Sequence, residues 1–340
     1  MIIPKTQVAR GVFRIGPMTT GNVRSAEAPT SPFIICGQER AAIMEPGERG
    51  QGYPTLQAIG ELGIDMDRIA YITVSHIHLH HFESINTLIK ELPHAKVVVH
   101  QRAVRHLVDP TQLNESTNQI WGEVGGHCGR LDPVPEDRIL GCVGGEVLDL
   151  GQRELDILDG RGHAPHQICI FDRLSRAIWV GDMCGHQNFA SEKGGEDILP
   201  PLFDVKLHIA SLNRVRALKP AVLFTFSGGG VSFAPEVTMQ YQEESVLAVE
   251  RICLEGMKKK MAAQEIGKML VEDRAKRAGG GTYSPIFKPD ASPQVRLPGL
   301  LHRLAADMPP FGMIAYLKRE HPELEWPKGM PGGQGSGRGL

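Results

Sequence analysis

Short apolar runs recur along the first two thirds of the chain, separated by Gly, Pro and charged residues that form turns. Runs of four to six β-branched or other apolar residues between such turns are typical of strands. We expect strands at 11–15, 32–36, 41–44, 69–74, 96–100, 147–150, 154–158, 168–171, 177–180 and 221–226. The pattern indicates a β-rich first part.

Other stretches place apolar residues at helical spacing. Residues 205–218 do so most clearly, and this predicted helix stops before Pro220. Further helices are expected at 54–62, 83–92, within 103–121 with an interruption near Pro110, and from 235 to 278. Helices therefore alternate with strands in the first half of the chain.

The composition changes after residue 234, where the strand pattern stops. Beyond the helical stretch we expect a Gly- and Pro-containing linker at 279–298, short helices near 300–306 and 313–319, and a disordered Gly-rich end. The pattern predicts an α/β domain at 1–234, a helical extension at 235–328 and a disordered tail at 329–340.

Size and charge bound the class of protein. A chain of 340 residues fits one large domain or two smaller ones, and its apolar and charged fractions are ordinary for a globular protein. A formal net charge of -2 gives no reason to expect nucleic acid or an anionic membrane as partner. The first ten residues lack the apolar core of a secretory signal, and no stretch is long and apolar enough to span a bilayer. We expect a cytoplasmic protein.

The 6 cysteines are scattered, and no two have the C-x-x-C spacing. In a chain of this length the scatter argues against a disulfide framework and against a zinc ribbon. Most of them are interpreted as small buried hydrophobic residues.

The densest candidate chemistry lies in residues 76–81, His-Ile-His-Leu-His-His, directly after the predicted strand at 69–74. Neutral histidine offers a nitrogen lone pair to metals near physiological pH. In an extended segment alternate side chains share a face, so His76, His78 and His80 can point together while the apolar residues pack behind them. A turn at the strand end can bring His81 to the same side.

Three later positions also follow predicted strands. His163 lies in Gly-Arg-Gly-His after one strand, Asp182 ends another, and Ser227 ends the last. With residues 76–81, this order resembles the metallo-β-lactamase superfamily, with its H-x-H-x-D-H motif, a later Gly-His, a Gly-Asp and a final His. The resemblance covers about residues 11–230 and implies an α/β fold, a four-layer αββα sandwich, here with a C-terminal helical extension.

The resemblance also implies a set of metal ligands. His76, His78 and His163 match the ligands of the first metal site. His81 and Asp182 match ligands of the second site, with Asp182 bridging both ions.

Two further residues match positions around the family's site. His166 corresponds to a histidine that is usually not a ligand, and we interpret it as a supporting or packing residue. Glu45 stands where the family usually has an Asp, and we interpret it as a supporting or turn carboxylate.

Two departures from the motif fall on the second site: His80 replaces the motif Asp, and Ser227 replaces the last His. A neutral hydroxyl is a poor zinc ligand, so we expect one tightly bound divalent ion, zinc, and a weak, altered or empty second site. If His80 ligates, the nitrogen-rich second site would favour iron, manganese or copper. Cys184 and His186 are conceivable substitute ligands, although we interpret both as loop residues near the metal. His127 is likewise a conceivable substitute ligand that we interpret as a loop residue near the metal.

The leading hypothesis is a metal-dependent hydrolase that uses a metal-activated water on an ester, thioester, lactone or related carbonyl substrate. Asp182 would hold the attacking hydroxide, and His80 would orient it or act as general base or acid. The partner is then a small-molecule substrate. As in glyoxalase II-like members, the C-terminal helices would cover the cleft mouth or mediate homodimerisation.

Two alternatives stay open. The first is an iron-dependent redox enzyme on the same fold, similar to sulfur dioxygenases or flavodiiron proteins. The second is a non-catalytic binding protein whose second metal site has decayed. The sequence names no substrate, because specificity in this scaffold lies in loops of mixed composition.

Overall fold

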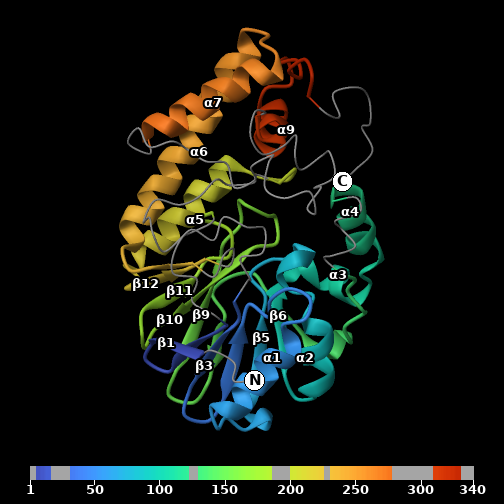
Figure 1. Cartoon of the computed structure of the whole chain (residues 1–340), viewed down its shortest axis with the longest axis vertical. Coiled ribbons are helices and arrows are strands. Elements are labelled where there is room, and N and C mark those ends of the chain that lie inside the picture. Colours follow the sequence, from blue (N-terminus) through green and yellow to red (C-terminus); the bar gives the residue numbers. More distant parts are fainter. Residues whose placement is uncertain are drawn as a thin grey trace, which may run out of the picture.

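The structure is a computed structural model in which two β-sheets lie face to face with helices outside them (Figure 1). It describes residues 5–16, 31–121, 129–185, 200–225, 230–277 and 309–330. The first sheet has seven strands in chain order: β1 (Lys5–Ala9), β2 (Val12–Ile15), β3 (Phe33–Cys36), β4 (Ala41–Met44), β5 (Ile69–Thr73), β6 (Lys96–His100) and β7 (Ile139–Cys142). The second has six, in the spatial order β13 (Val231–Ser232), β12 (Val222–Phe224), β11 (Ala177–Trp179), β10 (Ile168–Asp172), β9 (Glu154–Asp159) and β8 (Val147–Asp149).

The strands pair differently in the two halves of the first sheet. Strands β1 to β4 are antiparallel, whereas β4, β5, β6 and β7 are parallel neighbours. In the second sheet only β11 and β12 are parallel. Parallel neighbours end at the same edge, so the segments after β4, β5 and β6 emerge side by side.

Side chains alternate between the two faces of each strand, and this alternation explains why both faces of the sheet are covered. In β3, Phe33 and Ile35 point into the core between the sheets, where they meet Trp179 and Phe224 of the second sheet. Ile34 between them points to the other face and packs in the cluster that holds the outer helices. A strand with apolar residues on both faces must be covered on both sides.

Two short helices cover the outer face of the first sheet, and one longer helix covers the second. Helices α1 (Gly52–Glu61) and α2 (Ile85–Glu91) bury Ile59 and Leu88 with the first sheet. Helix α5 (Val205–Ala217) buries Leu212 and Val215 with Leu223 of the second sheet. The predicted αββα sandwich is confirmed.

The C-terminal helices form a cluster of their own. Helices α6 (Pro235–Lys258), α7 (Ala263–Arg277) and α9 (Phe311–Glu320) pack around Ile252, Ile266 and Ile314. The expected continuous helix at 235–278 is therefore wrong in one respect. It breaks after Lys258, where Lys260 has a positive φ of 54° that a helix does not accommodate.

Remaining elements are short. They are the helices α3 (Val104–Val108) and α4 (Thr111–Trp121), separated at Pro110 as predicted, and the 3-10 turns η1 (Met66–Arg68), η2 (Leu79–His81), η3 (Gln101–Ala103) and η5 (Glu136–Arg138). Strands β1, β7 and β13 were not predicted. The expected linker at 279–298, the helix near 300–306 and the tail beyond Met330 lie outside the described residues. Within the described ranges, no helix combines the length and apolarity needed to cross a bilayer.

Candidate metal centre

The first half of the site follows β5 at its carboxyl end. His76 and His78 lie in irregular backbone, and the 3-10 turn η2 then reverses the chain so that His81 returns to the same side. The ring centroid of His76 lies 4.6 Å from that of His78 and 4.7 Å from that of His81. Ile77 and Leu79 are buried in the core of the first sheet, as the alternation predicts.

The second half comes from the other sheet. His163 lies between β9 and β10, and its Nε2 is 3.3 Å from Nδ1 of His78. Asp182 follows β11, and its Oδ2 lies 3.1 Å from Nε2 of His81 and 3.8 Å from Nε2 of His76 and of His163. The carboxylate thus lies between the two predicted ligand sets, as a bridging ligand would.

The donor set fits a divalent cation. Ligand atoms of His76, His78, His81 and Asp182 all lie within 4.8 Å of one another. Nε2 of His76 is buried without a hydrogen-bond partner among the described residues, as expected of a nitrogen that faces a metal. Two nitrogens bound at 2.0–2.1 Å to a tetrahedral zinc are roughly 3.3 Å apart, which is the separation between His163 and His78.

The electrostatics favour the forms that bind a metal. Burial lowers the pKa of His76 and His163 well below its usual value, and lowers the pKa of His78 to about 4. These rings are therefore neutral at physiological pH. Burial alone would raise the pKa of Asp182, but the His81 ring, whose Nε2 lies 3.1 Å from Oδ2, holds it well below its usual range. Neutral imidazoles around an ionised carboxylate are the ligand forms that zinc requires.

Two motif glycines allow the close packing. Gly162 has a φ of 145°, and a Cβ there would lie 2.3 Å from Cα of His208 on α5. Gly181 has a φ of 55°, and a Cβ there would lie 2.5 Å from Oγ of Ser75. Any side chain at Gly181 would therefore push against the residue that holds His76.

A relay behind His76 sets its tautomer. Oγ of Ser75 lies 3.1 Å from Nδ1 of His76, and the backbone N–H of Ser75 donates to Oε2 of Glu45 at 3.4 Å, with the Ser75 hydroxyl close to the same carboxyl group. When the Ser75 hydroxyl accepts from Nδ1–H of His76, Nε2 keeps its lone pair toward the cluster. Burial raises the pKa of Glu45 to about 8.

Sequence reasoning found Glu45 but missed Ser75. Glu45 follows β4 with a φ of 55°, and β4 and β5 are parallel neighbours, so Glu45 lies beside Ser75, two residues after β5. The available signal was the Ser directly before the first His of the motif. The supporting role expected for Glu45 agrees with this geometry.

The remaining candidate residues fall into three groups. His166 lies beside the cluster, its ring centroid 6.1 Å from that of His78. Cys184 is buried in an apolar cluster with Met183 and Leu212 and is not part of the convergent ligand group. The side chain of His80 and all of His127, His186 and Ser227 lie outside the described residues.

From the sequence alone we expect the other histidines to be surface or packing residues. His94 is exposed and His106 and His321 are partly buried, whereas His100 and His208 are buried. His302 lies outside the described residues.

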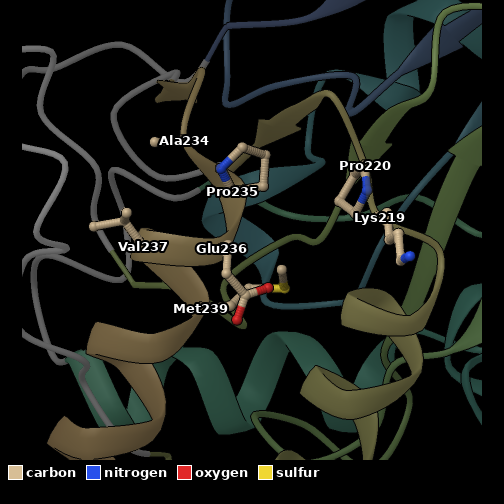
Figure 2. Close-up of a pocket in the computed structure, with 7 residues that line it drawn as sticks. All are labelled: Lys219, Pro220, Ala234, Pro235, Glu236, Val237 and Met239. Carbon is tan, nitrogen blue, oxygen red and sulfur yellow. The ribbon is translucent and has the colours of Figure 1, made fainter.

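A surface pocket of about 270 Å³ lies elsewhere, at the start of α6 (Figure 2). Pro235 and Pro220 face each other across it, and Glu236 and Met239 project below them. Glu236 is already paired with Arg216, with 2.9 Å between Oε1 and Nε. None of the residues that line it belongs to the convergent histidine–aspartate group, so the pocket is separate from the metal centre.

Known proteins of this fold resemble the chain in sequence and in structure. The chain is 26% identical over 226 residues to the metallo-beta-lactamase fold-containing protein ST1585 of Sulfurisphaera tokodaii, which covers 65% of this chain and 79% of that protein. The crystal structure of ST1585 from Sulfolobus tokodaii superposes with a TM-score of 0.56 at 24% identity, covering 70% of this chain and 86% of the other. The metallo-beta-lactamase family protein TTHA1429 from Thermus thermophilus superposes with a TM-score of 0.60 at 17% identity, covering 91% and 94%.

Both crystal structures are less than 25% identical to this chain, so these two comparisons show the fold alone. The sequence profile described as metallo-beta-lactamase superfamily matches residues 27–227, which is more than half of the chain. This match includes the histidine run after β5, the loop that carries His163 and the turn that carries Asp182. The chain therefore belongs to the metallo-β-lactamase superfamily.

Proposed function

We propose that this protein is a metal-dependent hydrolase that acts with water on an ester, thioester, lactone or related carbonyl substrate. The observation that carries the proposal is the convergence of His76, His78 and His163 from two sheets onto one buried cluster that contains Asp182. A divalent ion held by three imidazoles lowers the pKa of a bound water to about 7 and polarises a carbonyl oxygen.

The chain's own groups would position the reactants. Asp182 stays ionised, so its Oδ2 accepts a hydrogen bond from the attacking water and fixes the direction of its lone pair. The Glu45–Ser75 relay holds the ring of His76 in one orientation. His80, in the turn between His78 and His81, is proposed as the group that orients the water or transfers its proton.

We propose zinc for the site formed by His76, His78 and His163, because three nitrogens with an open position are a common catalytic zinc environment. His81 and Asp182 would hold a second, weaker ion. The helical extension at 235–328 is proposed to cover the cleft mouth or to mediate homodimerisation.

The test is substitution of His163 with Ala. Metal content after dialysis and turnover of a panel of nitrophenyl esters, thioesters and lactones should both fall to background. His94→Ala, an exposed imidazole away from the cluster, is the matched control and should retain both. Full turnover by His163→Ala would remove the proposal.

A redox enzyme on the same fold remains the second candidate, and the extra imidazole at His80 in the motif favours it. Metal analysis and an optical spectrum of anaerobically purified protein discriminate between the two, because zinc is colourless and redox-silent. Iron with a visible absorption band would favour the redox reaction. Ligand binding without turnover of any substrate in the panel would instead indicate a binding protein.

A further inference from the structure

Helix α5 holds the loop that carries His163 through hydrogen bonds to the loop backbone. The backbone N–H of Asp204, the residue before α5, donates to the carbonyl of Gly162 at 2.9 Å. Oγ of Ser211 donates to the carbonyl of Arg161 at 2.7 Å. The two residues directly before the metal ligand are therefore both hydrogen-bonded to this helix or its first residue.

The loop and the helix also pack closely against each other. A Cβ at Gly162 would lie 2.3 Å from Cα of His208, so the loop backbone lies directly on the helix. His208 and Ser211 are three residues apart, which places them on the same face of α5. A shift of this face should therefore move the loop and, with it, the imidazole of His163.

The start of α5 depends in turn on the C-terminal helical extension. Phe203 is fully buried in the apolar cluster of the extension, together with Ile314 and Leu317 of α9. The centroid of its ring lies 5.2 Å from that of the His208 ring. Phe203 therefore contacts both the extension and the face of α5 that holds the loop.

Arg319, in the last turn of α9, binds the backbone at the same point. Its Nη2 donates to the carbonyl of Phe203 at 2.7 Å, and its Nη1 donates to the carbonyl of Pro201 at 3.4 Å. A guanidinium presents its donors in a rigid fork, so one arginine can hold two carbonyls in a fixed relation. The side chain of α9 thus fixes the backbone that leads into α5.

The peptide group between Phe203 and Asp204 joins the two sets of contacts. Its oxygen accepts from Arg319, and its N–H donates to the carbonyl of Gly162. A trans peptide is planar, so its oxygen and hydrogen point in opposite directions from one rigid unit. A charged donor on the carbonyl also polarises the N–H and strengthens the hydrogen bond that it donates. Arg319 is therefore linked through a single peptide group to the residue before His163.

We propose that Arg319 is a positioning residue for the metal ligand His163 and acts through this peptide group. The role goes beyond the hydrolase proposal, because it concerns metal binding and needs no substrate. Small movements matter at this site, since Nε2 of His163 lies 3.3 Å from Nδ1 of His78, the separation expected of two nitrogens on one zinc. The helical extension thereby takes part in metal binding, although the convergent ligand group contains none of its residues.

The experiment compares variants of the full chain. Arg319→Ala removes both hydrogen bonds, whereas Arg319→Lys keeps the positive charge and a single donor group. Lys206→Ala is the matched control, because it breaks the ion pair with Glu320 between the same two helices and leaves the peptide group before α5 untouched. Zinc affinity is measured by competition with a chromophoric chelator. Hydrogen exchange over residues 159–164 is followed in the metal-free proteins by mass spectrometry.

Arg319→Ala should bind zinc about tenfold more weakly, the lower end of the loss seen when a group that orients a metal ligand is removed. Exchange over residues 159–164 should become faster. Arg319→Lys should lie between Arg319→Ala and wild type, and Lys206→Ala should match wild type in both measurements. The visible spectrum of the cobalt-substituted Arg319→Ala protein should shift, because a displaced His163 changes the coordination geometry.

A general loss of stability would lower the melting temperature without changing the cobalt spectrum or the zinc affinity of the folded protein. Wild-type zinc affinity in folded Arg319→Ala therefore overturns the proposal. An equal loss of affinity in Lys206→Ala also overturns it, because the effect would then belong to the contact between the helices. If Arg319→Ala does not fold, Arg319→Lys is judged by the same criteria. None of these measurements uses a substrate, so the result is independent of the hydrolase proposal.

Discussion

Substitution of Ser75 with Ala tests the relay behind the metal centre. The Ser75 side chain is fully buried and links Glu45 to Nδ1 of His76. Alanine removes only the hydroxyl, so the backbone after β5 and the position of His76 should persist. The ring of His76 then loses the partner that fixes its tautomer, and the buried carboxyl of Glu45 loses a donor.

The expected effect follows from these two losses. Removal of the group that orients a metal-bound histidine typically weakens metal binding 10–100-fold, which is about 1.4–2.7 kcal/mol. A buried polar group left without its partner costs roughly 1–3 kcal/mol of folding free energy. We therefore expect Ser75→Ala to bind zinc at least about tenfold more weakly and to unfold at a lower temperature without metal.

The assay is a competition titration of metal-free protein against a chromophoric zinc chelator. Ser116→Ala is the matched control, because its exposed hydroxyl bonds only to the Gln112 carbonyl on its own helix. Glu45→Gln should weaken zinc binding less than Ser75→Ala does, since the amide oxygen can still accept from the Ser75 hydroxyl. Wild-type affinity in a folded Ser75→Ala protein would show that the relay does not orient His76.

The remaining predictions concern stability. Gly181→Ala should lower both zinc affinity and stability, by about 1–3 kcal/mol, because its Cβ would press on Ser75; a chelator competition and a thermal melt measure both. Asp172→Asn should destabilise the fold by about 3 kcal/mol in denaturant titrations, because it breaks the buried ion pair to Arg153, whose Nη2 lies 2.6 Å from Oδ2. Burial lowers the pKa of His208 to about 4, so below pH 6.5 the unfolded chain binds more protons and the free energy of unfolding falls, by up to about 3 kcal/mol at pH 4. His208→Leu should therefore lose less stability than wild type between about pH 7 and about pH 4.5 in thermal melts, and an equal loss would contradict the assignment. Chelation of the metal should lower the melting temperature, since a ligand at about 1,000 times its Kd contributes about 4 kcal/mol.

Most strands were predictable because they are buried on both faces, whereas the four-layer arrangement was expected from the resemblance to the superfamily. Residues 33–36, 41–44 and 96–100 are nearly continuous apolar runs, and the turns between them are marked by Gly, Pro and charged residues. Strand β1 escaped prediction because it lies at the sheet edge and its residues are mostly half-exposed. Strand β13 has only two residues, too few for any periodicity.

The break between α6 and α7 was missed for a different reason. Lys258, Lys259 and Lys260 are good helix formers, so no local signal marks an end. The chain turns there because Met257 and Ile266 pack in one apolar cluster with α9, which two helices achieve and one straight helix does not. Tertiary packing decides this boundary.

At the metal centre, the sequence predicts those ligands whose role follows from residue type and spacing. His76, His78 and His81 are recognisable because four imidazoles in six positions have no packing explanation. The role of Ser75 cannot be predicted from the same stretch of sequence, because a serine before a histidine is common. Only its contact with Glu45 shows what this serine does. That neighbour lies 30 positions earlier in the chain. The parallel pairing of β4 with β5 creates the relay.

The same argument applies to the histidines around the metal centre. His100 and His106 read as packing or surface residues from the sequence, and His166 reads as an unused part of a motif. Parallel pairing of β5 with β6 brings His100 to the edge of the sheet at which the metal segment begins, and the loop before β10 brings the ring centroid of His166 within 6.1 Å of that of His78. In this chain His76, His78 and His81 are set by local spacing, whereas His163, Asp182 and the groups that orient the ligands depend on how the strands and the two sheets are arranged. Substitution of Ser75, two residues past the end of β5, should therefore weaken metal binding although every metal ligand is still present.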